Sequence, residues 1–257
     1  MIKFFRKIRQ SLLAEGKTKQ YAKYAAGEIF LVVIGILIAL QINNNNDQRK
    51  QRTKELHYLK NVNSDLQINI KQLNSFIVTR TGYMESARTI LNQFHPDSGM
   101  TFTEYNQLSL PLYNWEKFYQ NDNTYQELLN SGNLAMISND SIKNQLQNLA
   151  LLYLKLKSEE DHYRFDAEKT FYEPQYEFVD INVLLENFMF QVSDGKSGSE
   201  IEPTAAQLKQ IYGSISLKNG FTLSILEYDK MNGQMQEMIE LSEALISLIN
   251  EELKEDQ

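Results

Sequence analysis

The feature that most constrains this chain is an apolar run from Ala25 to Ile42, which reads AAGEIFLVVIGILIALQI. The run contains one acidic residue, Glu28, and no basic residue. About eighteen apolar residues with a rise of 1.5 Å each form a helix that can cross the hydrocarbon core of a bilayer. The sequence therefore predicts a single-pass membrane protein with a transmembrane helix over residues 25–42.

A cleaved signal peptide is the competing interpretation, because the run follows a basic segment. The apolar run is longer than the roughly 7–15 residues of a signal core. It also ends in Ala39–Asn43, ALQIN, which lacks the small-x-small pattern of a cleavage site. These observations favour an anchor that remains in the mature protein.

The distribution of charge predicts how this anchor is oriented. Residues 1–24 carry seven basic side chains and one acidic residue, Glu15, which gives this segment a net charge of +6. Since the whole chain has a net charge of −7, the remaining residues have a net charge of −13. A basic leader favours the cytoplasmic face and anionic lipid headgroups. We expect residues 1–24 in the cytoplasm and residues 43–257 in the periplasm, with the helix in the inner membrane. The acidic remainder argues against nucleic acid as a partner.

One face of the predicted transmembrane helix combines small and polar residues. Glu28, Val32, Gly35 and Ala39 follow each other at helical spacing. Gly35 and Ala39 form a small-xxx-small pattern, which lets two membrane helices approach closely, and Glu28 could hydrogen-bond across such an interface. The alternative is that Glu28 lies one turn inside the membrane and extends to the headgroups.

A heptad pattern follows the apolar run and predicts a long helix over about residues 45–93. The sequence HPDSG from His95 ends it. Two heptad positions are polar, Asn63 and Arg80. The stripe fits one face of an intramolecular bundle, or a parallel coiled coil between protomers in which Asn63 fixes the register. The repeating positions are Leu56, Leu59, Asn63, Leu66, Ile70, Leu73, Ile77, Arg80, Met84, Ala87, Leu91 and Phe94.

The clearest local signature is an interhelical turn within residues 124–140. Thr124 and Glu127 have the spacing of a capping box, and Gly132 suits the left-handed end of that helix. Ser138 or Asn139 is expected to cap the next helix. The residues assigned to this turn motif are Leu128, Gly132, Leu134, Ile137 and Asn139.

Helical periodicity covers most of the remaining chain, whereas Pro111 is expected to interrupt any helix in the aromatic-rich segment 102–119. Further helices are predicted over about residues 121–131, 140–171, 204–212 and 219–254. The expected fold is all-α: one transmembrane helix continuing into a long helix, followed by an antiparallel helical bundle over residues 43–257.

The sequence carries no recognisable catalytic constellation. The chain has no cysteine, which excludes disulfides and thiolate metal sites, and it lacks the common phosphate-binding, nucleophile-elbow and zinc-protease motifs. Residues 159–162, Glu-Glu-Asp-His, could bind a metal, but neighbouring helix positions point in different directions and favour a solvated charged surface. We therefore expect no catalytic residue, cofactor or metal, and no enzyme.

The segments MIKFFRKIRQSLL and YAAGEIFLVVIGILIALQINNNN resemble an uncharacterised family of single-span Bacteroidota inner-membrane proteins, a domain of unknown function. The matching positions are Gly27-Glu28-Ile29 and Ala39 to Asn43, and the segment from Leu128 to Asn139 resembles a second recurring stretch. This chain has Asn45 where the family usually has tryptophan. The resemblance implies an inner-membrane location and a helical periplasmic domain, and it implies no activity.

The leading hypothesis is a non-enzymatic, membrane-anchored scaffold or accessory subunit of a cell-envelope protein complex. Its partners would be membrane lipids and another envelope protein or a second copy of itself. A periplasmic ligand-sensing bundle that signals through a partner is one alternative, with segment 102–119 lining its pocket. An envelope hydrolase with dispersed carboxylates is another.

Overall fold

The structure is a computed structural model that describes residues 18–95, 97, 99–113, 116–176 and 179–254. These residues form helices joined by turns, and no strand occurs among them, which confirms the all-α fold class. The chain divides into two compact units, Met1–His57 and Tyr58–Gln257. Most of the predicted basic leader, residues 1–17, lies outside the described residues.

The first described element is one uninterrupted helix, α2 (Thr18–Asn92), which includes both the predicted transmembrane segment and the predicted long helix. In the polar stretch between the predicted transmembrane segment and the predicted long helix, side chains one turn apart form hydrogen bonds that stabilise α2. Gln41 Nε2 donates to Asn45 Oδ1, and Asn43 Nδ2 donates to Asp47 Oδ2, both over 3.1 Å. Such pairs satisfy amide groups along the helix surface, so the run of asparagines does not break the helix.

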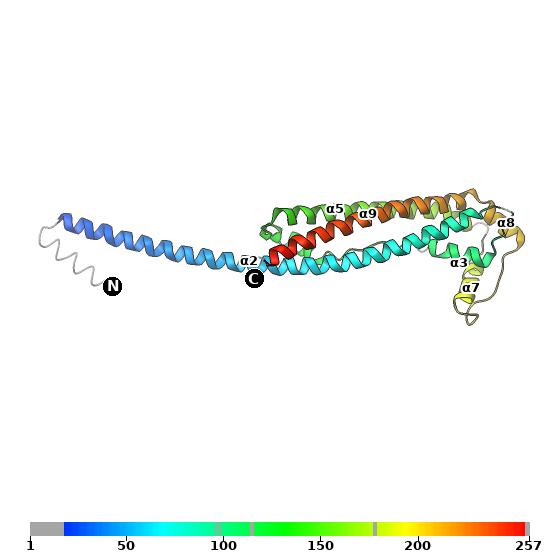
Figure 1. The fold of residues 1–257 in the computed structure, drawn as a ribbon, viewed down its shortest axis with the longest axis horizontal. Helices are drawn as coiled ribbons and strands as arrows, with labels where there is room; N and C mark the ends of the chain where they lie inside the picture. Colours follow the sequence, from blue (N-terminus) through cyan, green and yellow to red (C-terminus); the bar gives the residue numbers. More distant parts are fainter. Residues whose placement is uncertain (1–17, 96, 98, 114–115, 177–178, 255–257) are drawn as a thin grey trace. The chain divides into compact units, whose positions relative to one another are not determined.

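Three long helices form the bundle of the second unit: residues 58–92 of α2, α5 (Asp140–Ala167) and α9 (Ile215–Lys254). They lie side by side in Figure 1, with α9 antiparallel to the other two. Contacts between side chains fix this alignment, since Asn63 meets Asn250 near one end and Thr81 meets Asn232 further along. Because α2 and α5 run parallel, the chain returns between them through segments outside the three long helices.

Shorter elements form the rest of the second unit. Pro111 lies within the last turn of α3, so the expected interruption is wrong; a proline this close to the helix end removes only a terminal hydrogen bond. The elements are α3 (Phe102–Tyr113), α4 (Asn123–Asn130), the 3₁₀ turn η1 (Asn133–Met136), the π-helical turn η2 (Glu168–Tyr172), α6 (Glu173–Tyr176), α7 (Ile181–Val192) and α8 (Ala205–Gly213).

The core of the bundle is rich in aromatic side chains that meet edge to face. The Tyr105 ring contacts Tyr212 and Phe221 at centroid separations of 5.7 and 6.3 Å, and the Phe171 ring lies tilted against Phe221 at 5.0 Å. Such ring pairs contribute about 0.5–1.5 kcal/mol each beyond the burial of their area. The aromatic cluster thus joins α3, α8, α9 and η2 at one end of the bundle.

Candidate functional site

The apolar part of α2 is exposed on all sides. By length and composition, α2 is the one helix among the described residues that could cross a membrane, and none of its apolar window is buried within the protein. A water-soluble helix normally has a polar face, whereas a helix that is apolar all round requires an apolar environment. The exposed side chains are Ile29, Phe30, Leu31, Val32, Val33, Ile36, Leu37, Ile38, Leu40 and Ile42, which are 45–65% accessible.

The predicted interaction face lies on this surface. Val32, Gly35 and Ala39 are exposed on α2, and Glu28 is half-buried. A Cβ atom added to Gly35 would meet no described atom within 4 Å. Another helix could therefore approach closely along this face.

Asn63, proposed to fix a register, has its partners within the same chain. Its Nδ2 donates to Asn250 Oδ1 over 2.9 Å, and its Oδ1 accepts from Gln67 Nε2 over 2.7 Å. The heptad stripe of α2 is covered by α5 and α9, as the buried Leu59, Leu66 and Leu73 show. Asn63 therefore aligns α2 with α9 of the same chain. The alternative prediction, in which Asn63 fixes the register of a coiled coil between protomers, is wrong because other helices of the chain already cover this stripe.

The turn motif has the geometry that its residue types predict. Gly132 has a φ of 71°, Leu128 and Ile137 are fully buried, and Leu134 packs on the core. Asn139 caps α5, since its Oδ1 accepts from the backbone N–H groups of Ser141 and Ile142 over 3.0 and 3.3 Å. Its Nδ2 donates to Glu252 Oε1 over 2.8 Å, so the cap also holds the end of α9.

The predicted capping box of Thr124 and Glu127 is wrong. The α4 N-cap is Asp122, which makes no side-chain cap, and Thr124 is buried within the helix. Instead, Asp65 of α2 accepts from the Thr124 backbone N–H over 3.2 Å and from Asn121 Nδ2 over 2.9 Å. A residue distant in sequence supplies the carboxylate that stabilises this helix start, and no local pattern indicates such a partner.

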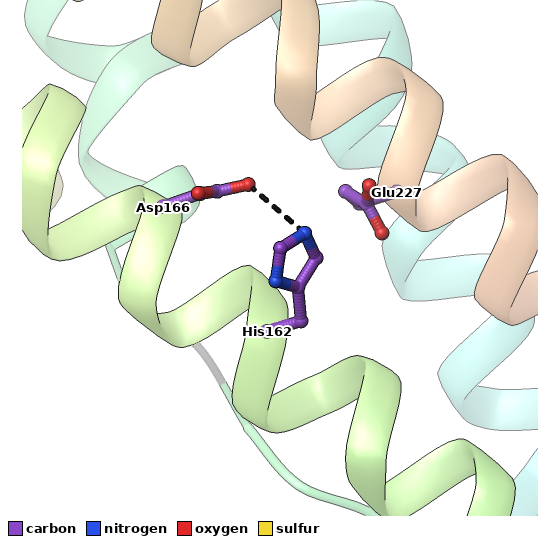
Figure 2. A group of neighbouring side chains, drawn as sticks. All are labelled: His162, Asp166 and Glu227. Carbon is purple, nitrogen blue, oxygen red and sulfur yellow. Dashed lines mark ion pairs between the residues drawn. The ribbon is translucent and has the colours of Figure 1, made fainter.

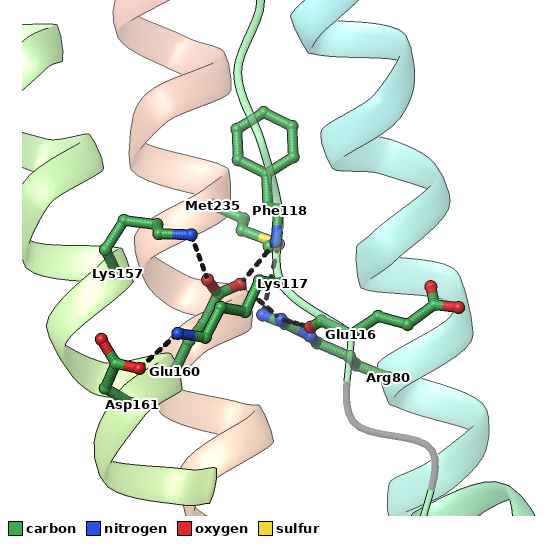
Figure 3. Close-up of polar contacts among 8 residues, drawn as sticks. All are labelled: Arg80, Glu116, Lys117, Phe118, Lys157, Glu160, Asp161 and Met235. Carbon is green, nitrogen blue, oxygen red and sulfur yellow. Dashed lines mark hydrogen bonds and ion pairs between the residues drawn. The ribbon is translucent and has the colours of Figure 1, made fainter.

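Arg80 forms a buried ion pair with Glu160 of α5. Arg80 Nη2 lies 2.7 Å from Glu160 Oε1, and both side chains are almost fully buried. Figure 3 shows that the same oxygen accepts from the Phe118 backbone N–H over 2.9 Å, while Arg80 donates to the Glu116 carbonyl over 3.1 Å. The pair therefore connects α2, α5 and the segment before α4.

The four residues of the acidic stretch 159–162 have different partners in the structure and do not form one site. Glu159 accepts from Lys230 Nζ of α9 over 2.5 Å, and this hydrogen bond raises the pKa of Lys230. A hydrogen bond from Lys117 lowers the pKa of Asp161. Glu160 is buried with Arg80, so the expectation of a solvated charged surface is wrong at that residue.

His162 lies instead near Asp166 and near Glu227 of α9. Figure 2 shows the three side chains converging from the two helices. One ligand atom from each lies within 4.8 Å of the others. The sequence did not single out Asp166 or Glu227; the signal available was the i, i+4 spacing of His162 and Asp166, and nothing local links them to Glu227.

Among the described residues of the aromatic segment 102–119, most aromatic side chains lie in the core, whereas Tyr119 is exposed. Phe102, Tyr105 and Phe118 are almost completely buried against other side chains. The pocket beside Arg80, Tyr83 and Glu116 has a volume of about 70 Å³, enough for one or two water molecules. These observations do not support a sensor pocket at this segment.

Together, the exposed apolar helix and the bundle define an all-α protein with one candidate membrane span. The chain belongs to a family of unknown function (DUF6090), whose model matches residues 28–175, more than half of its length. No curated protein and no solved structure matches the chain significantly. The matched range begins at Glu28 and includes the turn motif and both residues of the buried ion pair, whereas α9 lies outside it.

Proposed function

We propose that this chain is a non-enzymatic scaffold or accessory subunit of a cell-envelope protein complex, anchored in the inner membrane by residues 25–42. The observation that carries the proposal is the apolar surface of α2, which is unburied on every side. The resemblance to single-span inner-membrane proteins and the basic leader support a cytoplasmic N-terminus and a periplasmic bundle.

The bundle supports a binding role more than a catalytic one. Its acidic side chains Glu159, Glu160 and Asp161 each pair with a cation of the same chain. The face formed by Glu28, Val32, Gly35 and Ala39 offers the close approach that helix association in a membrane requires. Either a second copy or another envelope protein would bind there.

Cysteine labelling tests the anchor and its orientation, because the chain has no cysteine of its own. We would introduce Ser11→Cys or Lys196→Cys and treat intact or permeabilised cells with a membrane-impermeant maleimide. If the periplasm contains the bundle, Lys196→Cys reacts once the outer membrane is permeable, and Ser11→Cys reacts only after the inner membrane is opened. The reverse pattern, or release of the chain from membranes by alkaline carbonate, would contradict the proposal.

The proposed assembly is tested on the intact chain extracted in mild detergent. We expect co-purification of a stoichiometric envelope protein, or a homo-oligomer at all loadings. A chain that migrates alone and monomeric would argue against a scaffold role while leaving the anchor intact.

A further inference from the structure

His162, Asp166 and Glu227 form a three-residue group that joins α5 to α9. His162 and Asp166 are one turn apart on α5, and His162 Nε2 lies 3.6 Å from Asp166 Oδ2. Glu227 faces them from α9, so the three ligand atoms lie within 4.8 Å of one another (Figure 2). Because α5 and α9 are packed together, the backbone positions of this group are fixed by the core beneath them.

A second observation, independent of the grouping, is that one oxygen of the Glu227 carboxylate lacks a hydrogen-bond partner in the described part of the chain. Its Oε2 atom is fully buried and has no hydrogen-bond donor among the described residues. A buried carboxylate oxygen without a partner loses its hydration free energy without compensation, so such atoms normally contact a donor or a cation. Figure 2 shows Glu227 on α9 across from the His162 imidazole and the Asp166 carboxylate on α5.

Three cations of the described part of the chain each pair with another carboxylate, although the Glu227 charge also contributes to the raised pKa of Lys230. Lys230, one turn along α9 from Glu227, donates to Glu159 over 2.5 Å. Lys117 is held by Asp161, and Arg80 by Glu160. The group therefore combines two carboxylates with one imidazole, and a divalent cation supplies the opposite charge that such a ligand set attracts.

We propose that His162, Asp166 and Glu227 bind a divalent transition-metal ion, Zn²⁺ above all, that joins α5 to α9. Imidazole and carboxylate ligands suit Zn²⁺, whereas an imidazole disfavours Ca²⁺ and Mg²⁺, which prefer oxygen. Zn–N and Zn–O bonds of about 2.0–2.2 Å place tetrahedral ligand atoms about 3.4 Å apart, so modest side-chain rotations would close the group around the ion. Because the His162 side chain is more than half exposed, solvent can reach the site and a water molecule can occupy the fourth position. The inference does not depend on the scaffold proposal, since it concerns the bundle alone.

The test uses the untagged, full-length protein in detergent, stripped with a chelator and titrated calorimetrically with Zn²⁺. We expect one high-affinity Zn²⁺ per chain, and at least a tenfold weaker affinity for His162→Gln and for Glu227→Gln. The matched control is His95→Gln, which removes another exposed histidine and should bind Zn²⁺ as the unaltered chain does. Titration with Ca²⁺ should give at most weak binding that is indifferent to His162→Gln.

A second measurement separates the metal site from a role in folding. With Zn²⁺ in about hundredfold excess over its Kd, the melting temperature of the bundle should rise by about 5–10 °C, and each ligand variant should lose this rise. In chelator, Glu227→Gln should melt no lower than the unaltered chain, because the buried Oε2 atom has no hydrogen-bond donor to lose among the described residues. If that variant fails to fold, His162→Gln and Asp166→Asn decide the question. Absent or multiple weak Zn²⁺ binding, or unchanged affinity in the ligand variants, would overturn the proposal.

Discussion

Arg80 and Glu160 show how two charged residues can be accommodated inside a helical core. Their ion pair of 2.7 Å is supplemented by a backbone donor at Phe118 and a backbone acceptor at Glu116. The Arg80 guanidinium also lies 5.3 Å from the centroid of the Phe76 ring. Glu160 Oε2 is buried without a hydrogen bond from any described residue, and Lys157 Nζ lies 4.0 Å from it. These contacts compensate the two charges, whereas either charge alone would be buried without compensation.

We therefore expect Glu160→Ala to lower the free energy of unfolding by about 3–5 kcal/mol, because Arg80 loses its counter-charge. The double variant Arg80→Met with Glu160→Met should cost much less than the two single changes added together. Urea denaturation followed by circular dichroism measures both. The control is Arg88→Ala, which breaks the exposed pair with Glu85 and should cost less than about 1 kcal/mol. Equal losses for Glu160→Ala and Arg88→Ala would refute this account.

Buried tyrosines predict how the bundle responds to alkaline pH. Burial raises the pKa of Tyr212 to about 12 and raises the pKa values of Tyr105, Tyr113 and Tyr228 as well. A raised pKa means that the folded state holds the proton more tightly than the unfolded state, whose tyrosines titrate near pH 10. This stabilisation is complete below about pH 10 and is lost as the pH rises toward 12. Tyrosinate absorbance and helical circular dichroism should therefore change together above pH 10; titration of all tyrosines near pH 10 in a folded bundle would contradict this.

The helices differ in how far the sequence alone could define them. The heptad stripe predicts the long helix, and Gly132 and Asn139 predict the turn, because periodicity and capping are local properties. The Asp65 contact with Thr124 and the Arg80–Glu160 pair could not be predicted, because they require the alignment of different helices. The sequence marks Arg80 only as a polar heptad position, and with 33 acidic residues in the chain nothing local selects Glu160 as its partner.

The packing of α9 against the π-helical turn η2 depends on one glycine. A Cβ atom added to Gly220 would lie 2.7 Å from Thr170 Oγ1 and 2.8 Å from a Phe171 ring carbon, whereas one added to Gly233 would meet no described atom within 4 Å. Alanine favours a helix by about 1 kcal/mol over glycine, so Gly233→Ala should stabilise the protein by up to that amount. Gly220→Ala should instead destabilise it by about 1–3 kcal/mol through overpacking.

Thermal melting of these two variants of one helix gives a matched comparison. The structure predicts opposite signs for the change in melting temperature. If Gly220→Ala melted above the unaltered chain, α9 and η2 would not approach each other as closely as described.

For the whole molecule, the proposed membrane anchor raises the question of whether the apolar segment of α2 would serve as an anchor alone or would also recognise another helix. An anchor needs length and hydrophobicity alone, and any apolar substitution would preserve it. Recognition needs a particular face, because helices in lipid associate through close packing of small residues. Gly35 and Ala39 lie on one face with Glu28, and Ala26 lies on the opposite side of the helix.

This difference can be measured with isoleucine substitutions, which keep the segment apolar. We expect Gly35→Ile to reduce association of the membrane segment at least severalfold, because the added side chain holds the partner helix away. Ala26→Ile adds a comparable side chain on the other side and should leave association unchanged. Both variants should remain in the membrane fraction. A reporter of helix association in membranes, or cross-linking of the intact chain, measures the effect. Equal association for the two variants would mean that the segment serves as an anchor alone, and recognition would then have to reside in the bundle.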